Sequence, residues 1–416
     1  MPPNQVKLIR FVIPVIIALT ALVALWYMST QPSPPVRTPE VNLTSTSLAT
    51  LDDPICPVDS STDVGEILFT VQRYGSCTID SFGCVSRVEL CTINANGTGL
   101  RQVALLPTDM GNLAWSPDRQ QITYYLFEND TDYVGSPLYV KGIHDAEAIP
   151  LVESFFPGTL LSWSPDGAYI AYATFSLDSS LINIFTVTTD GTNKTRQIGQ
   201  TNLNATSFSS VAWSNDGAKL AVEALTIQDL ANGVGRLDSE IFIMNADGSE
   251  RHQLTDNEWD DCCASWTPDG QTLVFLTKNQ GQNLSSLFRV DLPSLNPQLF
   301  FPNPLPILNS PTWSSDGRMA VIESSGSSGN IFVFDPDMND FVPLVRNGFY
   351  NHTLVWSPHG QQLLFLSRQH VILNNNPGGN ILYIVNADGT GLTRLTSFPE
   401  GISVDHPTWG RTLLGN

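Results

Sequence analysis

The chain has 416 residues, of which 42% are hydrophobic, and it carries 40 acidic residues against 20 basic ones, a net charge of -20. This hydrophobic content excludes a disordered chain, and the acidic surface repels nucleic-acid backbones, so we expect no nucleic-acid partner. The 30 glycines and 28 prolines are typical of many short strands joined by turns.

The first element in chain order is an uncharged apolar run over residues 11–28. Its 18 residues are just enough to span a bilayer as a helix. Lys7 and Arg10 precede the run, and the next basic residue is Arg37. The positive-inside rule therefore places residues 1–10 in the cytoplasm and the rest of the chain outside. We expect an uncleaved transmembrane anchor; a cleaved signal peptide is the alternative, and both would export the body of the protein.

Residues 29–54 are rich in proline, serine and threonine, a composition typical of a partly stiffened linker. Such a linker would hold the folded domain, residues 55–416, away from the membrane. We therefore predict a single-pass protein of the cell membrane whose main domain lies on the extracytoplasmic side.

The chain has six cysteines, and an even number in an exported protein indicates disulfides. Cys77 and Cys84 bracket a short polar loop, so they are the first candidates for a pair. Cys262 and Cys263 are adjacent and could form a strained vicinal disulfide, or each could pair elsewhere. No Cys-x-x-Cys pair is present, so the pattern gives no support for a zinc or thioredoxin-type site.

A tryptophan followed by a turn, usually Trp-Ser-Pro-Asp-Gly or a close variant, recurs along the domain. Successive tryptophans are 43 to 53 residues apart, which is close to the length of a four-stranded propeller blade. We interpret these residues as structural, because tryptophan fills wide apolar gaps and aspartate locks turns. The set comprises Trp115, Trp163, Trp213, Trp266, Trp313, Trp356 and Trp409, with turn aspartates Asp118, Asp166, Asp216, Asp269 and Asp316.

Each repeat has the same order of predicted strands. An apolar strand follows the turn, as at 273–276, then a second strand ends in an Asp-Gly turn, as at 241–244. Residues 65–107 contain three strands but no tryptophan strand, whereas 406–409 form a tryptophan strand with no blade after it. We therefore predict an all-β, seven-bladed, monomeric β-propeller, in which the C-terminal strand completes the N-terminal blade and leaves no open edge.

These motifs resemble the PD40 repeats of the TolB-like propeller superfamily, which are WD40-like repeats ending in Trp-Ser-Pro-Asp-Gly. The resemblance covers residues 65–410 and includes Asn-Ala-Asp-Gly turns at 245–248 and 386–389, each followed by Leu-Thr. Proteins resembling this one serve as periplasmic scaffolds that dock onto other envelope proteins. Related propellers are fused to serine peptidases or bind sugars, so the resemblance implies the fold and leaves several functions open.

The sequence contains no Gly-x-Ser-x-Gly elbow, no His-Glu-x-x-His pair and no nucleotide-binding glycine motif. A serine hydrolase would also need an α/β domain, for which the repeats leave no residues. We therefore do not expect an enzyme.

Ligands of propellers commonly bind at one mouth of the central channel, on residues that precede each tryptophan. Asp261 and Asp405 lie five and four residues before their tryptophans, and we expect them to occupy matching positions. We also expect His352 and His406 to be close across the closure. We interpret the polar residues as a candidate binding rim, with solvated loop ends as the alternative. The rim comprises Asp261, Asn309, Asn351, His352, Asp405 and His406.

The acidic segment 335–340 resembles the opening of a calcium loop, with acidic or amide groups at alternate positions. It lacks the glycine at the sixth position and the glutamate at the twelfth. We therefore interpret it as an acidic turn, with calcium as the alternative, and expect no other cofactor or metal.

The anchor, the linker and a propeller without catalytic motifs together favour a membrane-anchored interaction scaffold of the cell envelope. The alternative is a glycan or small-molecule binding protein that uses the mouth of the channel. A third possibility is a lyase or hydrolase with acid and base groups at His352, Asp405 and His406.

Overall fold

The computed structural model describes residues 53–58, 66–74, 85–127, 136–155, 161–175, 182–192, 195–200, 205–229, 235–278, 284–301, 304–307, 309–325, 328–336, 338–368 and 379–410. The predicted anchor 11–28, nearly all of the linker, Cys77 and Cys84 lie outside these residues. No helix in the described ranges is long and apolar enough to cross a membrane. The fold below is that of the unit Thr50–Asn416.

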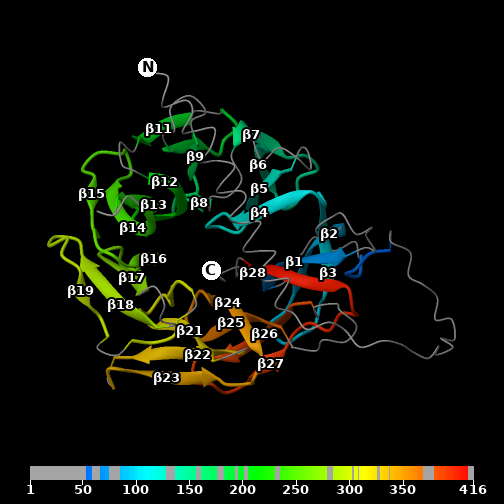
Figure 1. Ribbon diagram of the computed structural model, residues 1–416. Coiled ribbons are helices and arrows are strands. Elements are labelled where there is room, and N and C mark those ends of the chain that lie inside the picture. The colour runs from blue at the N-terminus through cyan, green and yellow to red at the C-terminus, as the bar shows by residue number, and fades with distance from the viewer. Residues whose placement is uncertain are drawn as a thin grey trace, which may run out of the picture. The chain divides into compact units, whose positions relative to one another are not determined.

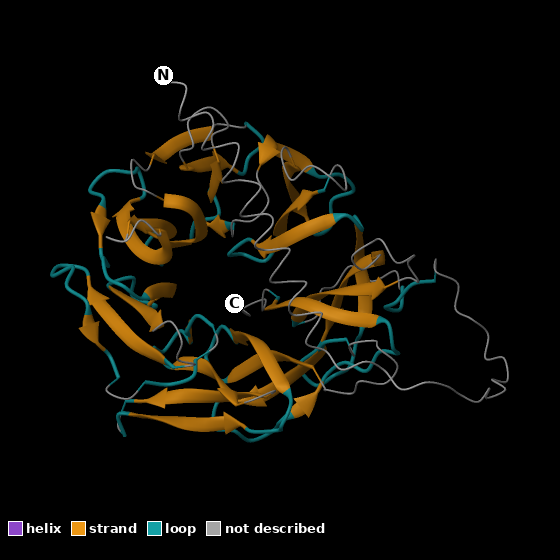
Figure 2. Cartoon of the chain, viewed as in Figure 1, coloured by secondary structure: helices purple, strands orange, loops and turns teal. Residues whose placement is uncertain are grey.

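Seven four-stranded antiparallel sheets form a ring of blades (Figures 1 and 2), which confirms the predicted seven-bladed propeller. From inner to outer strand, blades 1 to 4 are β28 (Ile402–Trp409), β1 (Ile67–Tyr74), β2 (Val85–Ile93), β3 (Arg101–Leu106); β4 (Met110–Trp115), β5 (Gln121–Leu126), β6 (Ser136–Gly142), β7 (Ile149–Phe155); β8 (Ser162–Trp163), β9 (Tyr169–Phe175), β10 (Ile182–Thr188), β11 (Thr195–Gln200); and β12 (Ala205–Trp213), β13 (Lys219–Asp229), β14 (Gly235–Asn245), β15 (His252–Gln253). Blades 5 to 7 are β16 (Asp260–Trp266), β17 (Thr272–Lys278), β18 (Ser285–Asp291), β19 (Gln298–Leu299); β20 (Thr312–Trp313), β21 (Met319–Ser325), β22 (Ser328–Asp335), β23 (Asp340–Val345); and β24 (Tyr350–Trp356), β25 (Gln362–Arg368), β26 (Ile381–Asn386), β27 (Thr393–Arg394).

The hydrophobic core lies between neighbouring blades. The second strand of a blade is buried on both faces, as in β17, where 273–277 are all buried. One core cluster joins Ile241 and Ile243 of blade 4 to Leu273 and Phe275 of blade 5. This double burial explains why these strands are continuous apolar runs rather than alternating ones.

The ring is closed by the C-terminal strand, as predicted. Strand β28 pairs antiparallel with β1, and Trp409 stands opposite Ile67. Two backbone hydrogen bonds extend the pairing at either end, from Gly410 N to Glu66 O (2.7 Å) and from Tyr74 N to Gly401 O (2.8 Å). The first blade is therefore built from both ends of the domain, and β28 covers the inner edge of β1.

The tryptophans link each blade to the one before it. In five of them the indole Nε1–H donates to the carbonyl of the residue that precedes the tryptophan of the previous blade. Trp115 differs, because it donates to His406 O (3.0 Å). The five bonds run from Trp163 to Ala114 (3.3 Å), Trp213 to Ser162 (3.1 Å), Trp266 to Ala212 (3.2 Å), Trp356 to Thr312 (3.3 Å) and Trp409 to Val355 (3.2 Å).

Trp313 offers an internal control for this hydrogen bond. Its buried Nε1 has no hydrogen-bond partner among the described residues. We expect Trp266→Phe to lower the free energy of unfolding by about 1 kcal/mol more than Trp313→Phe, because only the first loses a bond. Urea denaturation of the two variants measures the difference, and equal losses would show that the indole bonds do not stabilise the ring.

The turn aspartates form hydrogen bonds within their own turns. Ser164 Oγ donates to Asp166 Oδ1 (2.5 Å), and the same oxygen accepts the backbone N–H of Ala168 (3.0 Å). These bonds hold the pKa of Asp166 below its usual value. The same pair of bonds recurs at Asp118, Asp216 and Asp269. At Asp316 the bond from Ser314 Oγ recurs, and the N–H of Arg318 donates to Ser314 Oγ (2.9 Å).

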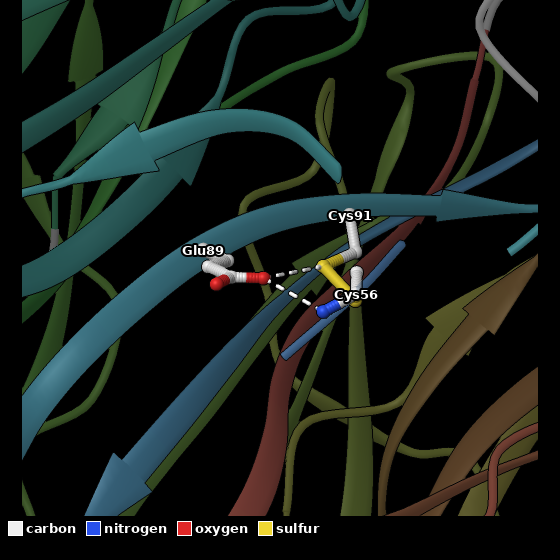
Figure 3. A group of neighbouring side chains, drawn as sticks. All are labelled: Cys56, Glu89 and Cys91. Carbon is white, nitrogen blue, oxygen red and sulfur yellow. Dashed lines mark hydrogen bonds between the residues drawn. A yellow bond between two sulfur atoms is a disulfide. The ribbon is translucent and has the colours of Figure 1, made fainter. Parts of the chain in front are cut away.

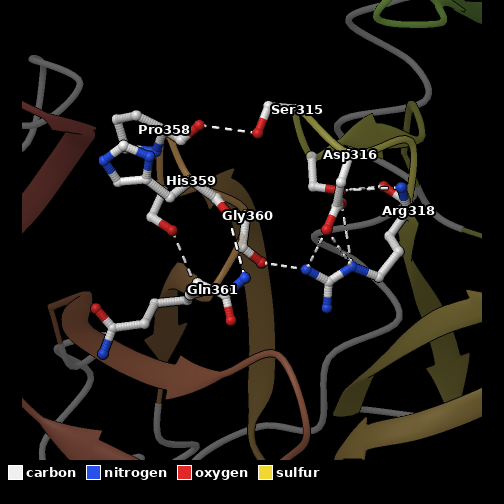
Figure 4. Close-up of polar contacts among 10 residues, drawn as sticks. Ser315, Asp316, Arg318, Pro358, His359, Gly360 and Gln361 are labelled. Atoms are coloured by element: carbon white, nitrogen blue, oxygen red, sulfur yellow. Dashed lines mark hydrogen bonds and ion pairs between the residues drawn. The ribbon is translucent and has the colours of Figure 1, made fainter.

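Neighbouring turns also contact each other, as Figure 4 shows for blades 6 and 7. Arg318 pairs with Asp316 (2.7 Å), donates to Gly360 O (2.7 Å) and lies over the ring of Trp356. Ser315 Oγ donates to Pro358 O (2.8 Å). Hydrogen bonding and the charge of Arg318 lower the pKa of Asp316 to about 2.

The acidic segment after β22 is a turn whose side chains bond to its own backbone. Asp335 Oδ1 accepts the N–H of Met338 (3.2 Å), and Asp340 Oδ1 accepts that of Phe341 (2.7 Å). Asp337 lies outside the described residues. The carboxylates of Asp335 and Asp340 thus accept backbone hydrogen bonds within the segment, as expected for an acidic turn.

A disulfide ties the start of the domain to blade 1 (Figure 3). It joins Cys56 to Cys91 of β2, 35 residues apart in sequence. Buried Glu89 accepts the N–H groups of Ile55 and Cys56 (2.8 Å each) and pairs with Arg87. Among the described residues, Cys56, Glu89 and Cys91 are the one group of three or more potential metal ligands whose ligand atoms lie within reach of one another. The sulfurs are bonded to each other, so we interpret the group as a structural clasp.

Candidate functional site

Four innermost strands carry a β-bulge three residues before their tryptophan. The bulged residues have left-handed backbones, with φ of 35° at Asn112, 65° at Cys263, 53° at Thr353 and 50° at His406. The strand registers shift at the same places. Bulges redirect side chains, so the residues around them define the candidate rim.

The register shows which rim residues are equivalent. Cys262, His352 and Asp405 stand opposite the same position of the neighbouring strand, and Asp261 is equivalent to Asn351. The predicted match of Asp261 with Asp405 is therefore wrong by one position. Strands β16, β24 and β28 each contain this single bulge. No extra residue in one strand therefore makes up for the fact that Asp261 lies five residues before its tryptophan and Asp405 only four.

Polar side chains of blades 7 and 1 meet at the closure of the ring. Asn380, just before β26, bridges two predicted rim residues: its Oδ1 lies 3.1 Å from His352 Nε2, and its Nδ2 donates to Asp405 Oδ1 (2.9 Å). Arg368 Nε also donates to Asn380 Oδ1 (3.2 Å). We call His352, Arg368, Asn380 and Asp405 the closure cluster.

Burial shifts the pKa values of two residues of the closure cluster. It raises the pKa of Asp405, against the hydrogen bonds from Asn380 and Ser403, and lowers the pKa of His352. Burial and the charge of Asp405 raise the pKa of nearby Tyr74. Because an uncharged amide separates His352 from Asp405, the cluster is arranged to orient polar groups rather than to pass a proton between these two.

His406 is not part of the closure cluster. Its Nδ1 lies 3.0 Å from Thr70 Oγ1 on β1. Burial lowers the pKa of His406 to about 4, so the ring is neutral at pH 7. The expected approach of His352 and His406 is replaced by the approach of His352 and Asp405 through Asn380.

The other rim residues bond locally. Buried Asp261 accepts hydrogen bonds from Thr277 Oγ1 (2.5 Å) and Asn257 Nδ2 (2.6 Å). Asn351 is also buried and donates to Gly329 O (2.7 Å). Asn309 Oδ1 is buried and has no hydrogen-bond partner in the described ranges. The predicted rim is thus several separate groups rather than one site.

Sequence reasoning missed Asn380 and Arg368, which stand on the β25–β26 side of blade 7, outside the tryptophan spacing. The sequence feature that could have pointed to Asn380 is the glycine directly before it, Gly379. A Cβ on Gly379 would lie 1.9 Å from Ile402 O, so only glycine allows this strand to approach β28.

Two buried carboxylates lie near each other between blades 4 and 5. Glu240 Oε1 accepts the N–H of Asn257 (3.1 Å), and Asn257 also bonds to Asp261. Burial raises the pKa of Glu240 to about 7, against hydrogen bonds from Thr255 and Asn257, and the charges of Asp261 and Asp238 raise it further. This group therefore makes folding sensitive to pH.

We expect Glu240→Gln to flatten the dependence of stability on pH. Folded Glu240 keeps its proton up to about pH 7, whereas the unfolded chain releases it near 4.5. The folded state binds more protons in this window, so rising pH costs the wild type up to about 3 kcal/mol. Urea denaturation at pH 5 and pH 8 tests this, with exposed Glu250→Gln as the control. Equal pH slopes in wild type and Glu240→Gln would contradict it.

Comparisons with known proteins agree on the propeller. The chain is 26% identical over 219 residues to the Tol-Pal system protein TolB of Anaeromyxobacter dehalogenans, which covers 47% of this chain and 46% of that protein. The chain spans less than half the length of the curated relatives it matches.

Solved structures of two kinds of enzyme share the fold. A prolyl endopeptidase superposes with a TM-score of 0.60 at 12% identity, over 84% of this chain and 50% of that one. An oligogalacturonate lyase in complex with manganese gives 0.55 at 14% identity, over 79% and 94%. At these identities the likeness shows the fold alone.

The repeat itself gives the family. Residues 137–413 match PD40, the TolB beta propeller domain. That range holds six of the seven repeat tryptophans and the strand that closes the ring. The chain therefore belongs to the TolB-like β-propeller family.

Proposed function

We propose that this protein is an interaction scaffold of the cell envelope, anchored by residues 11–28 with its propeller on the extracytoplasmic side. The observation that carries the proposal is the TolB propeller domain itself, because the curated relative of that name is a protein of the Tol-Pal system.

A surface pocket of about 450 Å³ in blade 5 is the docking surface that we infer for the partner. The connection from β15 to β16 forms one wall and supplies the exposed residues Asp256, Glu258 and Trp259, of which Trp259 is 43% exposed. Phe288 and Pro297 contribute apolar surface. An exposed tryptophan among carboxylates fits a basic, partly apolar segment, and aromatic anchors of this kind dominate many interfaces.

The scaffold is tested by crosslinking and affinity recovery from native membranes. The full-length chain and a version that starts at Asp53 serve as baits. We expect both to recover the same envelope protein in stoichiometric amount, and only the full-length chain to fractionate with the membrane. If neither bait recovers a protein partner, the proposed scaffold function is wrong. If an alkaline wash releases the full-length chain from the membrane, the proposed anchor is wrong.

We expect Trp259→Ala to reduce recovery of that partner at least tenfold, because a central aromatic anchor is commonly worth 2 kcal/mol or more (a rough figure). Leu299→Ala is the matched control, since Leu299 lies on β19 of the same blade and is 51% exposed. Equal recovery by both variants would place the partner on another face.

A glycan or small molecule at the closure cluster is the second candidate. It is favoured by the gathering of His352, Asp405 and Arg368 around one amide. Alanine at His352 and Asp405 would abolish binding of such a ligand and leave recovery of a protein partner on blade 5 unchanged. Isothermal titration of the variants with candidate glycans separates the two functions.

A further inference from the structure

Two adjacent cysteines on an innermost strand have no part in the proposed function. Cys262 and Cys263 lie on β16, where Cys262 is buried and Cys263 is half-buried. No bond joins them, yet their Sγ atoms are 2.7 Å apart. Unbonded sulfurs do not pack so closely, and a disulfide bond is about 2.04 Å long. The backbone thus holds the two side chains in position to react with each other.

The bulge explains this closeness. Adjacent side chains on a regular strand point to opposite faces of the sheet. Cys263 has a left-handed backbone, with φ of 65°, at the bulge that it shares with Asn112, Thr353 and His406. The conformation recurs without cysteine in three other blades, so it belongs to the fold. In blade 5 alone it brings two sulfurs together.

The surroundings give the two thiols different roles. Lys278 Nζ lies 4.0 Å from Cys263 Sγ, and an ammonium group favours a thiolate. The hydrogen bond from Cys262 and the charge of Lys278 lower the pKa of Cys263, against burial and Glu223. The same hydrogen bond and burial raise the pKa of Cys262. In the reduced pair Cys263 is therefore the nucleophile and Cys262 the protonated partner.

We propose that Cys262 and Cys263 are a redox-active pair that alternates between a dithiol and a vicinal disulfide by exchange with a low-molecular-weight disulfide. The Cys263 thiolate attacks one sulfur of that disulfide, whose S–S bond breaks and releases the other sulfur as a thiolate. Cys262 then loses its proton and attacks the Cys263 sulfur, which releases the second thiolate. Counted from the dithiol, including the proton that Cys263 loses on ionisation, the pair gives up two electrons and two protons, which convert the external disulfide into two thiols.

Adjacency makes the proposed bond easy to reduce. Consecutive Cα atoms are about 3.8 Å apart, below the range of roughly 4.4–6.8 Å in ordinary disulfides. Cys56 and Cys91, at 6.4 Å, lie within that range. Strained disulfides are the labile ones, so the vicinal bond should open under conditions that leave Cys56–Cys91 closed. Cys262 is equivalent to His352 and Asp405 in register, which places this chemistry on the predicted rim.

Peptide mapping of the full-length chain tests the pair. The protein is equilibrated in glutathione buffers of graded redox potential, quenched with acid, alkylated and digested with trypsin. Both cysteines fall in the peptide His252–Lys278, which has no other cysteine. In oxidising buffer we expect this peptide unalkylated and lighter than the dithiol by two hydrogens. In mildly reducing buffer it should carry two alkyl groups while Cys56 and Cys91 remain linked.

Two outcomes would overturn the proposal: a peptide crosslinked to another cysteine peptide, or one doubly alkylated in every buffer that keeps Cys56 and Cys91 linked.

The role of Lys278 is tested separately on the reduced protein. Lys278→Gln should slow alkylation of Cys263 several-fold at neutral pH. Lys219→Gln is the control, because Lys219 bonds to Asn245 and has the same charge. Equal rates in both variants would remove Lys278 from the assignment.

Discussion

Deletion of residues 402–416 should leave the chain unable to fold, because it removes β28 from the first blade. Strand β28 pairs with β1 along its length, and its buried residues include Val404, Thr408 and Trp409. Val404 and Trp409 share a core cluster with Leu364 and Leu382 of blade 7. The loss would therefore expose two blades at once and open the inner edge of β1 to pairing with other chains.

The measurement is the recovery of soluble protein with a cooperative thermal transition. Deletion of residues 411–416 is the matched control, since it keeps β28 and Gly410 and should melt like the full chain. A 402–416 deletion that melted cooperatively near the wild-type temperature would show that the ring does not depend on this closure.

The sequence was enough to predict the ring, because the features that build it are local and repeated. A tryptophan followed by a turn of the Ser-Pro-Asp-Gly type specifies a strand, a turn and a contact with the previous blade. Six such copies and a seventh tryptophan strand at 406–409 specify a closed ring. The closure could also be predicted, since the N-terminal blade lacked one strand and the C-terminus had one to spare. In each case the spacing along the chain carried the information.

The candidate site could be predicted only in part, because its contacts join positions that no repeat relates. His352 and Asp405 were expected at the rim, but Asn380, which bridges them, stands 25 residues before Asp405 on a different blade. The bulge at Cys263 and His406 depends on a left-handed backbone, which is uncommon for residues other than glycine. Asp261 lies five residues before its tryptophan and Asp405 four residues before its own, and because the strands share the same bulge, this difference of one residue persists in the fold.

The pairing of the cysteines is a second case in which spacing along the chain did not reveal a contact. The even number of cysteines indicated pairing, but closeness in sequence drew attention to Cys77 and Cys84, which lie outside the described residues. Cys56 and Cys91 are 35 residues apart and are brought together by Glu89, which binds the backbone of residues 55 and 56. No spacing rule predicts a contact that a buried carboxylate creates between an incoming segment and the second strand of a blade.

Replacement of both Cys56 and Cys91 by serine should lower the free energy of unfolding by about 3–4 kcal/mol, because the bond closes a loop of 35 residues. The midpoint of urea denaturation should fall, and the fluorescence of the tryptophans reports the transition. Glu89→Gln is the companion variant: it keeps the disulfide but weakens the bonds to Ile55 and Cys56, so its loss should be smaller. A double serine variant as stable as the wild type would show that Glu89 alone holds the start of the domain against blade 1.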